Sequence, residues 1–127
     1  MDTKKNILLV DDEKMIASTG GQLLKILGYE SVACTSSVEA LQYYSDHTGE
    51  IDIVITDLTM PGMNGVELAE KILAISPEMP VILCTGFNEG LTKEKALKAG
   101  IRAFLMKPYT SAELSRILSD VISNNLS

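Results

Sequence analysis

The sequence predicts an α/β domain built on a doubly wound parallel sheet of five strands. Five short apolar runs, rich in β-branched residues, recur about every 25 residues, as buried strands do. The stretches between them place apolar residues three or four positions apart, which is typical of amphipathic helices. Strands and helices that alternate in this way form right-handed crossovers, so the sheet is parallel and helices cover both of its faces.

The expected strands follow directly from the apolar runs. Because these runs are largely apolar, we expect them to be buried on both faces of the sheet. They cover Ile7–Val10, Ser31–Cys34, Ile51–Ile55, Pro80–Cys84 and Ala103–Met106.

The first expected helix follows the first strand and ends at Gly28, since glycine is favoured just past a helix C-terminus. Its apolar face runs from Met15 to Leu27 at helical spacing. The pair Gly20-Gly21 in its interior is the poorest local fit, because each glycine costs up to about 1 kcal/mol relative to alanine. We interpret this pair as making room for close packing on the sheet.

The later helices carry their own start and stop signals. Ser36 stands three residues before Glu39, and Thr110 three before Glu113, so the second and fifth helices are each expected to open with a capping box. The third helix covers the apolar repeat at 66–75. The fourth covers 92–99 and ends at Gly100.

Length and charge predict a single acidic domain over residues 1–127. The chain has 127 residues, 46% of them apolar, and a formal charge of −6. An acidic surface opposes phosphate backbones and anionic headgroups, so we expect no direct contact with nucleic acid or membrane. No apolar stretch is long enough to cross a bilayer, and residues 1–5 lack the apolar core of a signal peptide. We therefore expect a cytoplasmic protein.

Two cysteines, Cys34 and Cys84, each lie in an apolar run. Neither belongs to a CxxC motif, and the chain has far fewer cysteines than a disulfide-rich scaffold. We expect two buried, reduced thiols.

Polar side chains follow four of the five expected strands. Asp11 and Asp12 follow the first strand, Asp57 the third, Thr85 the fourth and Lys107 the fifth. The carboxyl ends of parallel strands meet at one edge of a sheet, where open α/β sheets bind their ligands. Each residue alone is more typical of a turn, a cap or a surface charge, but their convergence at one edge indicates a functional site.

Three carboxylates at one edge repel one another unless a cation lies between them. Oxygen ligands without histidine or thiolate favour Mg²⁺, which keeps several waters and also binds phosphate oxygens. Besides the metal ion, Lys107 supplies a second positive charge for the oxygens of a transferring phosphoryl group, and the Thr85 hydroxyl can donate a hydrogen bond to these oxygens. Asp57 is the candidate nucleophile, since carboxylates form aspartyl phosphates in several enzymes.

Four motifs occur in a specific order and spacing along almost the whole chain. They are ILLVDDE at 7–13, DLTMPGMNG at 57–65, TG at 85–86 and FLMKP at 104–108. Together they resemble the receiver domain of two-component response regulators. The resemblance implies the flavodoxin-like sheet with strand order 2-1-3-4-5. The segments at 55–63 and 82–87 look most like receivers of hybrid histidine kinases.

The resemblance also implies a function. Asp57 accepts a phosphoryl group from a phosphohistidine on a histidine kinase or a histidine phosphotransfer domain, so the domain is not an enzyme acting on outside substrates. Asp12 and Asp57 supply side-chain oxygens to Mg²⁺, Thr59 supplies its backbone carbonyl, and Asp11 holds the water shell of the metal. Lys107 bridges to the phosphoryl oxygens.

In the same family, phosphorylation changes an output face. Thr85 moves toward the phosphorylated aspartate, and Phe104 occupies the aromatic switch position, so the face of the fourth helix, fifth strand and fifth helix is remodelled. A phosphorylation-dependent homodimer through this face is a family possibility. The Lys107-Pro108 bond resembles the cis peptide of the family. Phe87, two residues after Thr85, is bulky and apolar, and we expect it to slow attack by water on the phosphoryl group.

Three alternatives use a similar architecture. A small Mg²⁺-dependent aspartyl-phosphate phosphatase or phosphotransferase of the haloacid dehalogenase type needs Asp-x-Asp after the first strand, where this chain has adjacent Asp11-Asp12. A nucleotide or flavin module needs a glycine-rich phosphate loop at that position. A receiver-shaped interaction module would lack the acceptor residues, which are present here.

Overall fold

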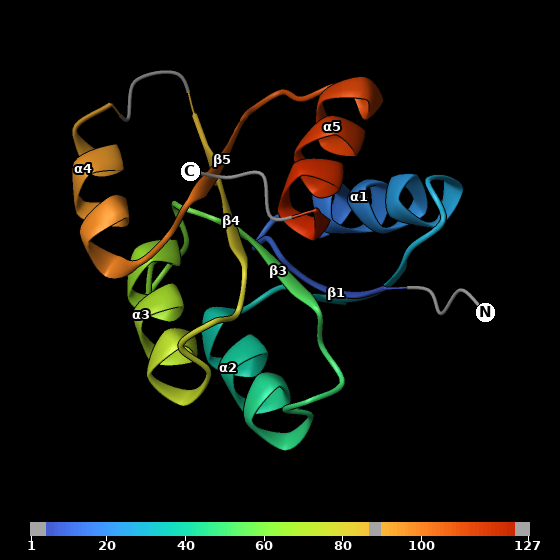
Figure 1. Ribbon diagram of the computed structural model, residues 1–127. Coiled ribbons are helices and arrows are strands. Elements are labelled where there is room, and N and C mark those ends of the chain that lie inside the picture. Colours follow the sequence, from blue (N-terminus) through green and yellow to red (C-terminus); the bar gives the residue numbers. More distant parts are fainter. Residues whose placement is uncertain (1–4, 87–89, 124–127) are drawn as a thin grey trace.

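The computed structural model describes residues 5–86 and 90–123 of the chain. Five parallel strands form one sheet in the order β2-β1-β3-β4-β5, which confirms the predicted fold (Figure 1). Parallel pairing links every neighbouring pair of strands. The strands are β1 (Asn6–Val10), β2 (Glu30–Cys34), β3 (Ile53–Asp57), β4 (Val81–Thr85) and β5 (Ala103–Met106).

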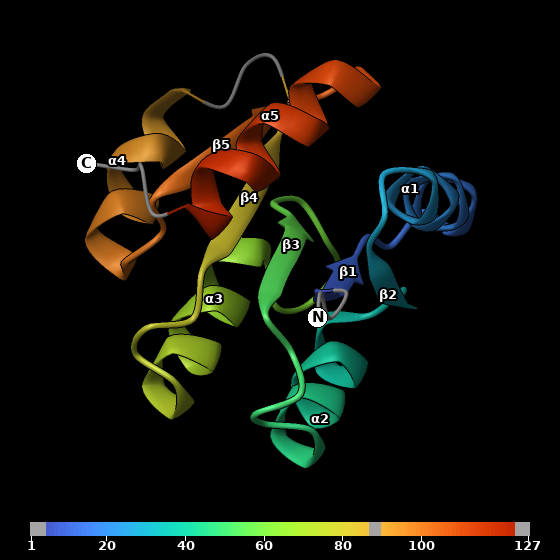
Figure 2. The ribbon, with the colours of Figure 1, turned by 45° about the vertical axis from the view of Figure 1, so that its right-hand side comes forward.

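Five helices cover the two faces of the sheet (Figures 1 and 2). Helices α1 and α5 lie on one face, and α2, α3 and α4 lie on the other. Two apolar clusters fill the space between the layers, one on each face of the sheet. The helices are α1 (Lys14–Ile26), α2 (Ser37–Asp46), α3 (Gly65–Ile75), α4 (Gly90–Ala99) and α5 (Ser111–Ile122).

Burial differs between the central and the edge strands. All five residues of β3 are buried, as are the last four of β1 and the first four of β4. In β2 only Cys34 is buried, and in β5, at the other edge, Met106 is exposed, so the prediction that every strand is buried on both faces is wrong for β2 and for the end of β5. The reason is the strand order, which places β2 at an edge of the sheet.

The third strand begins and ends later than its apolar run. It extends through Asp57, which pairs with Cys84 in the ladder between β3 and β4. The Leu58 N–H then donates to the Cys84 carbonyl at 2.9 Å. Asp57 is therefore held by the sheet itself, which restricts its backbone more than a loop would.

The capping predictions are confirmed fully for one helix and partly for the other. Thr110 and Glu113 form a reciprocal capping box at α5. At α2, Ser36 accepts from the Glu39 N–H, but the Glu39 carboxylate accepts from the N–H of Thr35 instead of Ser36. A further capping box, Asn64 with Glu67, opens α3 and was not identified in the sequence.

The two glycines inside α1 have different surroundings. A Cβ at Gly20 would lie 2.9 Å from Leu9 Cδ2 and 3.4 Å from the Tyr109 hydroxyl, so close packing on the sheet is confirmed there. A Cβ at Gly21 would meet only Ser31 Oγ, at an ordinary 3.5 Å. The steric interpretation is therefore wrong for Gly21.

The cysteine predictions hold, since Cys34 and Cys84 are both free and buried. Burial raises the pKa of Cys34 to about 11 and that of Cys84 to about 12, which keeps both thiols protonated and unreactive. Among the described residues, no helix combines the length and the apolar character needed to span a membrane.

Candidate functional site

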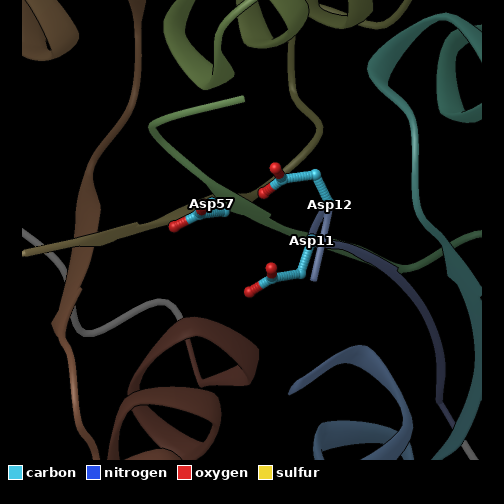
Figure 3. A group of neighbouring side chains, drawn as sticks. All are labelled: Asp11, Asp12 and Asp57. Carbon is cyan, nitrogen blue, oxygen red and sulfur yellow. The ribbon is translucent and has the colours of Figure 1, made fainter. Parts of the chain in front are cut away.

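Three carboxylates meet at the carboxyl edge of the sheet (Figure 3). Asp11 and Asp12 follow β1 directly, and Asp57 is the last residue of β3. One carboxylate oxygen from each residue lies within 4.8 Å of the others. Asp11 and Asp57 are buried, with 4% and 8% of their surface exposed, whereas Asp12 is exposed. The predicted convergence of these strand ends is confirmed.

Lys107 joins this cluster from the end of β5. Its ammonium Nζ lies 2.9 Å from Asp11 Oδ2 and 2.8 Å from Asp57 Oδ1. Its backbone N–H donates to the Thr85 carbonyl at 2.8 Å, and the Lys107-Pro108 peptide bond is cis, as the resemblance implies. One ammonium therefore bridges two carboxylates that belong to different strands.

Backbone hydrogen bonds fix the position of Asp11. Its N–H donates to the Cys34 carbonyl at 3.1 Å, which ties the end of β1 to the end of β2. One carboxylate oxygen, Oδ1, accepts from the Glu13 N–H at 2.9 Å, so the other, Oδ2, is directed to Lys107. The Asp11 side chain thus both closes the turn into α1 and binds the lysine.

The start of α3 packs directly against the backbone of Asp57. The Gly65 N–H donates to the Leu58 carbonyl at 2.8 Å. A Cβ at Gly65 would overlap the Asp57 carbonyl oxygen and would lie 2.9 Å from Leu83 Cδ1. Only glycine fits at this point without a shift of the strand or the helix. The pair Asn64 and Glu67 is a capping-box pattern that could have predicted this helix start from the sequence, but it was not identified.

Charge and burial oppose each other in this site. Burial raises the pKa of Asp57, the ion pair with Lys107 lowers it in part, and the negative charges of Asp11 and Asp12 raise it again. The net result is a pKa above the ordinary value. Burial lowers the pKa of Lys107, but the hydrogen bonds to Asp57 and Asp11 outweigh this effect, so its pKa lies above the ordinary value.

The raised pKa of Asp57 leads to a prediction for the metal-free protein. The folded state binds the Asp57 proton more tightly than the unfolded state does. The stabilisation that this group contributes is therefore complete below pH 3.8, its ordinary pKa, and is lost as pH rises through the folded-state pKa. We therefore expect Asp57→Asn to raise the melting temperature in the presence of a chelator, and to raise it more at pH 7.5 than at pH 5.

Thermal unfolding followed by circular dichroism at the two pH values measures this effect. Asp46→Asn, which removes the same charge at an exposed position of α2, is the control for net charge. A melting temperature that falls in Asp57→Asn, or a rise of equal size in the control, would contradict the prediction.

The remaining predicted site residues lie around this cluster. Thr85 ends β4 and is half-buried, and Thr59 is exposed in the loop after β3. Phe104 in β5 is half-buried and packs on the cluster shared with α2, α3 and α4, and Lys93 Nζ lies 5.3 Å from the centre of its ring. The roles of these residues stay predictions. Phe87 lies outside the described residues.

A doubly wound sheet with an acidic triad and a bridging lysine at its carboxyl edge defines a phosphoacceptor type of signalling domain. A family model described as the response regulator receiver domain matches residues 7–119. The chain belongs to this family, and it is a receiver domain of the two-component type. The phosphatase alternative is not favoured.

Individual relatives agree with this assignment. The C4-dicarboxylate transport transcriptional regulatory protein DctD of Rhizobium meliloti is 35% identical over 115 residues, which are 90% of this chain and 24% of DctD. The chemotaxis protein CheY of Thermotoga maritima is 30% identical over 118 residues, which are 92% of this chain and 97% of CheY. A response regulator receiver domain protein from Clostridium thermocellum is similar in structure, with a TM-score of 0.91, 35% identity and coverage of 95% of this chain and 96% of that one.

The share of each relative that this chain covers differs widely. The chain spans about a quarter of DctD but nearly all of this CheY.

Receiver domains are not enzymes of the ordinary kind, and they interact with histidine kinases or histidine phosphotransfer proteins. The acidic cluster of this chain is of a kind that could hold a metal ion.

Proposed function

We propose that this domain is the phosphoacceptor of a two-component phosphorelay, and that Asp57 takes the phosphoryl group from a phosphohistidine on a histidine kinase or a histidine phosphotransfer domain. The bridge that Lys107 makes between Asp57 and Asp11 is the main support. It places a fixed positive charge 2.8 Å from the oxygen of the candidate nucleophile. An ammonium at this distance is suited to the oxygens of a transferring phosphoryl group.

The transfer is an in-line displacement at phosphorus. An Oδ of Asp57 attacks, an O–P bond forms, and the N–P bond of the phosphohistidine breaks. The electron pair of that bond stays on the imidazole nitrogen, which takes up a proton. Lys107 and the Thr85 hydroxyl interact with the phosphoryl oxygens, whose charge is about −1.5 to −2 at neutral pH.

The donor set of the site fits a divalent cation. Three carboxylates face one ammonium, which leaves an excess of two negative charges. We propose that Asp12 and Asp57 bind Mg²⁺ directly, with the backbone carbonyl of Thr59, and that Asp11 holds its water shell. When bound, Mg²⁺ supplies a Lewis acid for the phosphoryl oxygens. Oxygen-only ligands favour this hard cation over zinc or copper.

The surface beside Lys107 suits a protein partner. Met15, in the first turn of α1, is 81% exposed. A mainly apolar hollow of about 440 Å³ lies between α1 and the segment at 107–109. A partner that delivers its phosphohistidine to Asp57 would contact this surface.

The response to phosphorylation is proposed from the same family pattern. Thr85 moves toward the phosphoryl group, Phe104 fills the vacated space, and the face of α4, β5 and α5 changes shape. A phosphorylation-dependent homodimer through that face, a cytoplasmic location, a single domain over residues 1–127 and a hybrid-kinase parent belong to this proposal.

Intact mass spectrometry after incubation with acetyl phosphate tests the proposed function. We expect the mass of one phosphoryl group to be added only when Mg²⁺ is present, and to be lost in Asp57→Asn. Asp46→Asn is the matched control and is expected to gain the group. A folded protein that gains no phosphoryl group from acetyl phosphate or from a phosphorylated histidine phosphotransfer domain would refute the proposal. Multiple turnover of a phosphomonoester would favour the phosphatase alternative.

A further inference from the structure

We infer that Tyr109 is a positioning residue for phosphoryl transfer, because its ring, packed on the apolar cluster that the sheet shares with α1 and α5, holds the Lys107 ammonium between Asp11 and Asp57. The inference rests on the proposed function and adds a residue that the sequence analysis did not single out. Tyr109 stands two positions after Lys107 in the segment that connects β5 to α5.

The ring of Tyr109 is packed between the layers. It is half-buried and lies against the apolar cluster that β1, β3, β4 and β5 share with α1 and α5. Its hydroxyl oxygen would be 3.4 Å from a Cβ at Gly20, so the hydroxyl lies beside α1 at that position.

This contact links the two halves of the site. Helix α1 begins directly after Asp11, Asp12 and Glu13, so its position is tied to two of the three carboxylates. The Tyr109 ring is tied through one residue to Lys107. Packing of the Tyr109 ring on the cluster shared with α1 thus ties the lysine segment to the helix that follows the carboxylates.

Lys107 is anchored on one side by its backbone and on the other by Tyr109. Its N–H donates to the Thr85 carbonyl at 2.8 Å, which fixes the segment to β4. Lys107, Pro108 and Tyr109 together form one wall of the hollow beside α1. Without the ring, the hollow would extend under this wall, and the segment would lose its packing on the cluster shared with α1.

The Tyr109 hydroxyl interacts electrostatically with Asp11 and Lys107 of the site. Burial raises its pKa to about 12, and the negative charge of Asp11 adds to the rise while Lys107 opposes it. The hydroxyl is therefore neutral at physiological pH. Tyr109 supplies volume at this position without adding a fourth negative charge to the carboxylates.

Truncation of the ring should affect the lysine and spare the metal ligands. In Tyr109→Ala we expect the maximal rate of phosphorylation by acetyl phosphate to fall about tenfold, because small misplacements of a positioned group cost large factors in rate. The Mg²⁺ concentration that gives half of this rate should not rise above that of the parent, since the carboxylates are unchanged and a displaced ammonium competes less with the metal. Tyr109→Phe keeps the ring and should recover most of the maximal rate.

Tyr29→Ala is the matched control. Tyr29 packs on the same apolar cluster but follows the other end of α1, next to β2. This variant should lower the melting temperature and leave the maximal rate unchanged. Equal loss of rate in Tyr29→Ala and Tyr109→Ala, or a parental rate in Tyr109→Ala, would overturn the inference.

A second measurement does not depend on phosphoryl transfer. The side-chain ammonium protons of Lys107, followed by ¹⁵N NMR in the metal-free protein, exchange slowly with water while the group bridges Asp11 and Asp57. They should exchange about tenfold faster in Tyr109→Ala and at the parental rate in Tyr109→Phe, by the same positioning argument. Unchanged exchange in Tyr109→Ala would overturn the inference even if the parent accepted no phosphoryl group, so its failure and that of the proposed function are distinguishable.

Discussion

Lys107→Ala is expected to slow the phosphorylation of Asp57 by acetyl phosphate by about two to three orders of magnitude, which is the typical loss when one donor to a transferring oxygen is removed. In the folded protein the Lys107 ammonium lies 2.8 Å from Asp57 Oδ1 and 2.9 Å from Asp11 Oδ2. No other lysine or arginine makes an ion pair with these carboxylates in the described part of the chain.

The same variant should change metal binding in the opposite direction. Loss of the ammonium leaves the buried carboxylates without their cation, so Mg²⁺ should bind more tightly even though the reaction is slower. Isothermal titration with Mg²⁺ and a phosphorylation time course measure the two effects. Lys98→Ala, on the exposed side of α4, is the matched control and should change neither. Weaker Mg²⁺ binding together with a parental rate would contradict the assigned role of Lys107.

Gly65→Ala is expected to destabilise the fold by about 2 kcal/mol, in the range found when extra volume is forced into a packed site. The added methyl group would overlap the Asp57 carbonyl oxygen and press on Leu83 Cδ1 at 2.9 Å. The overlap involves backbone, which a side-chain rotation does not relieve. Because the displaced group belongs to the candidate acceptor, phosphorylation should slow in the same variant.

Gly21→Ala provides the comparison for this substitution. It lies inside α1, where a Cβ meets only Ser31 Oγ at 3.5 Å, so alanine should stabilise the protein by up to about 1 kcal/mol through its helix propensity. Urea unfolding of both variants gives the two free energies. If Gly65→Ala is as stable as the parent, the tight contact between α3 and the acceptor strand is not a constraint on the fold.

Much of the fold could be predicted because it depends on local patterns. Alternation of apolar runs with helical repeats identifies the five strands and five helices, and the parallel sheet then brings the residues after each strand to one edge. Asp11, Asp57 and Lys107 were found in this way. The exposure of β2 could not be predicted from these local patterns, because it depends on which strand lies at the edge of the sheet. The strand order was implied by the family resemblance and not by the patterns.

The parts that sequence analysis missed depend on distances between remote segments. The spacing of Asn64 and Glu67 is that of a capping box and could have been recognised in the sequence. The close contact between Gly65 and the Asp57 carbonyl could not, because it depends on where α3 packs. Likewise Tyr109 meets Gly20 only after α1 and the segment following β5 have packed on the same face. No spacing along the chain reveals such a contact.

The bridge made by Lys107 gives the domain an internal counterion. A buried pair of carboxylates would otherwise depend on a cation from solution for its neutrality, and the fold would then vary with the ionic composition of the surroundings. With the lysine in place, we expect the fold not to depend on divalent ions, which only the proposed phosphoryl transfer requires. Under the proposed function, the domain can therefore stay folded and unphosphorylated before Mg²⁺ and the phosphoryl donor bind.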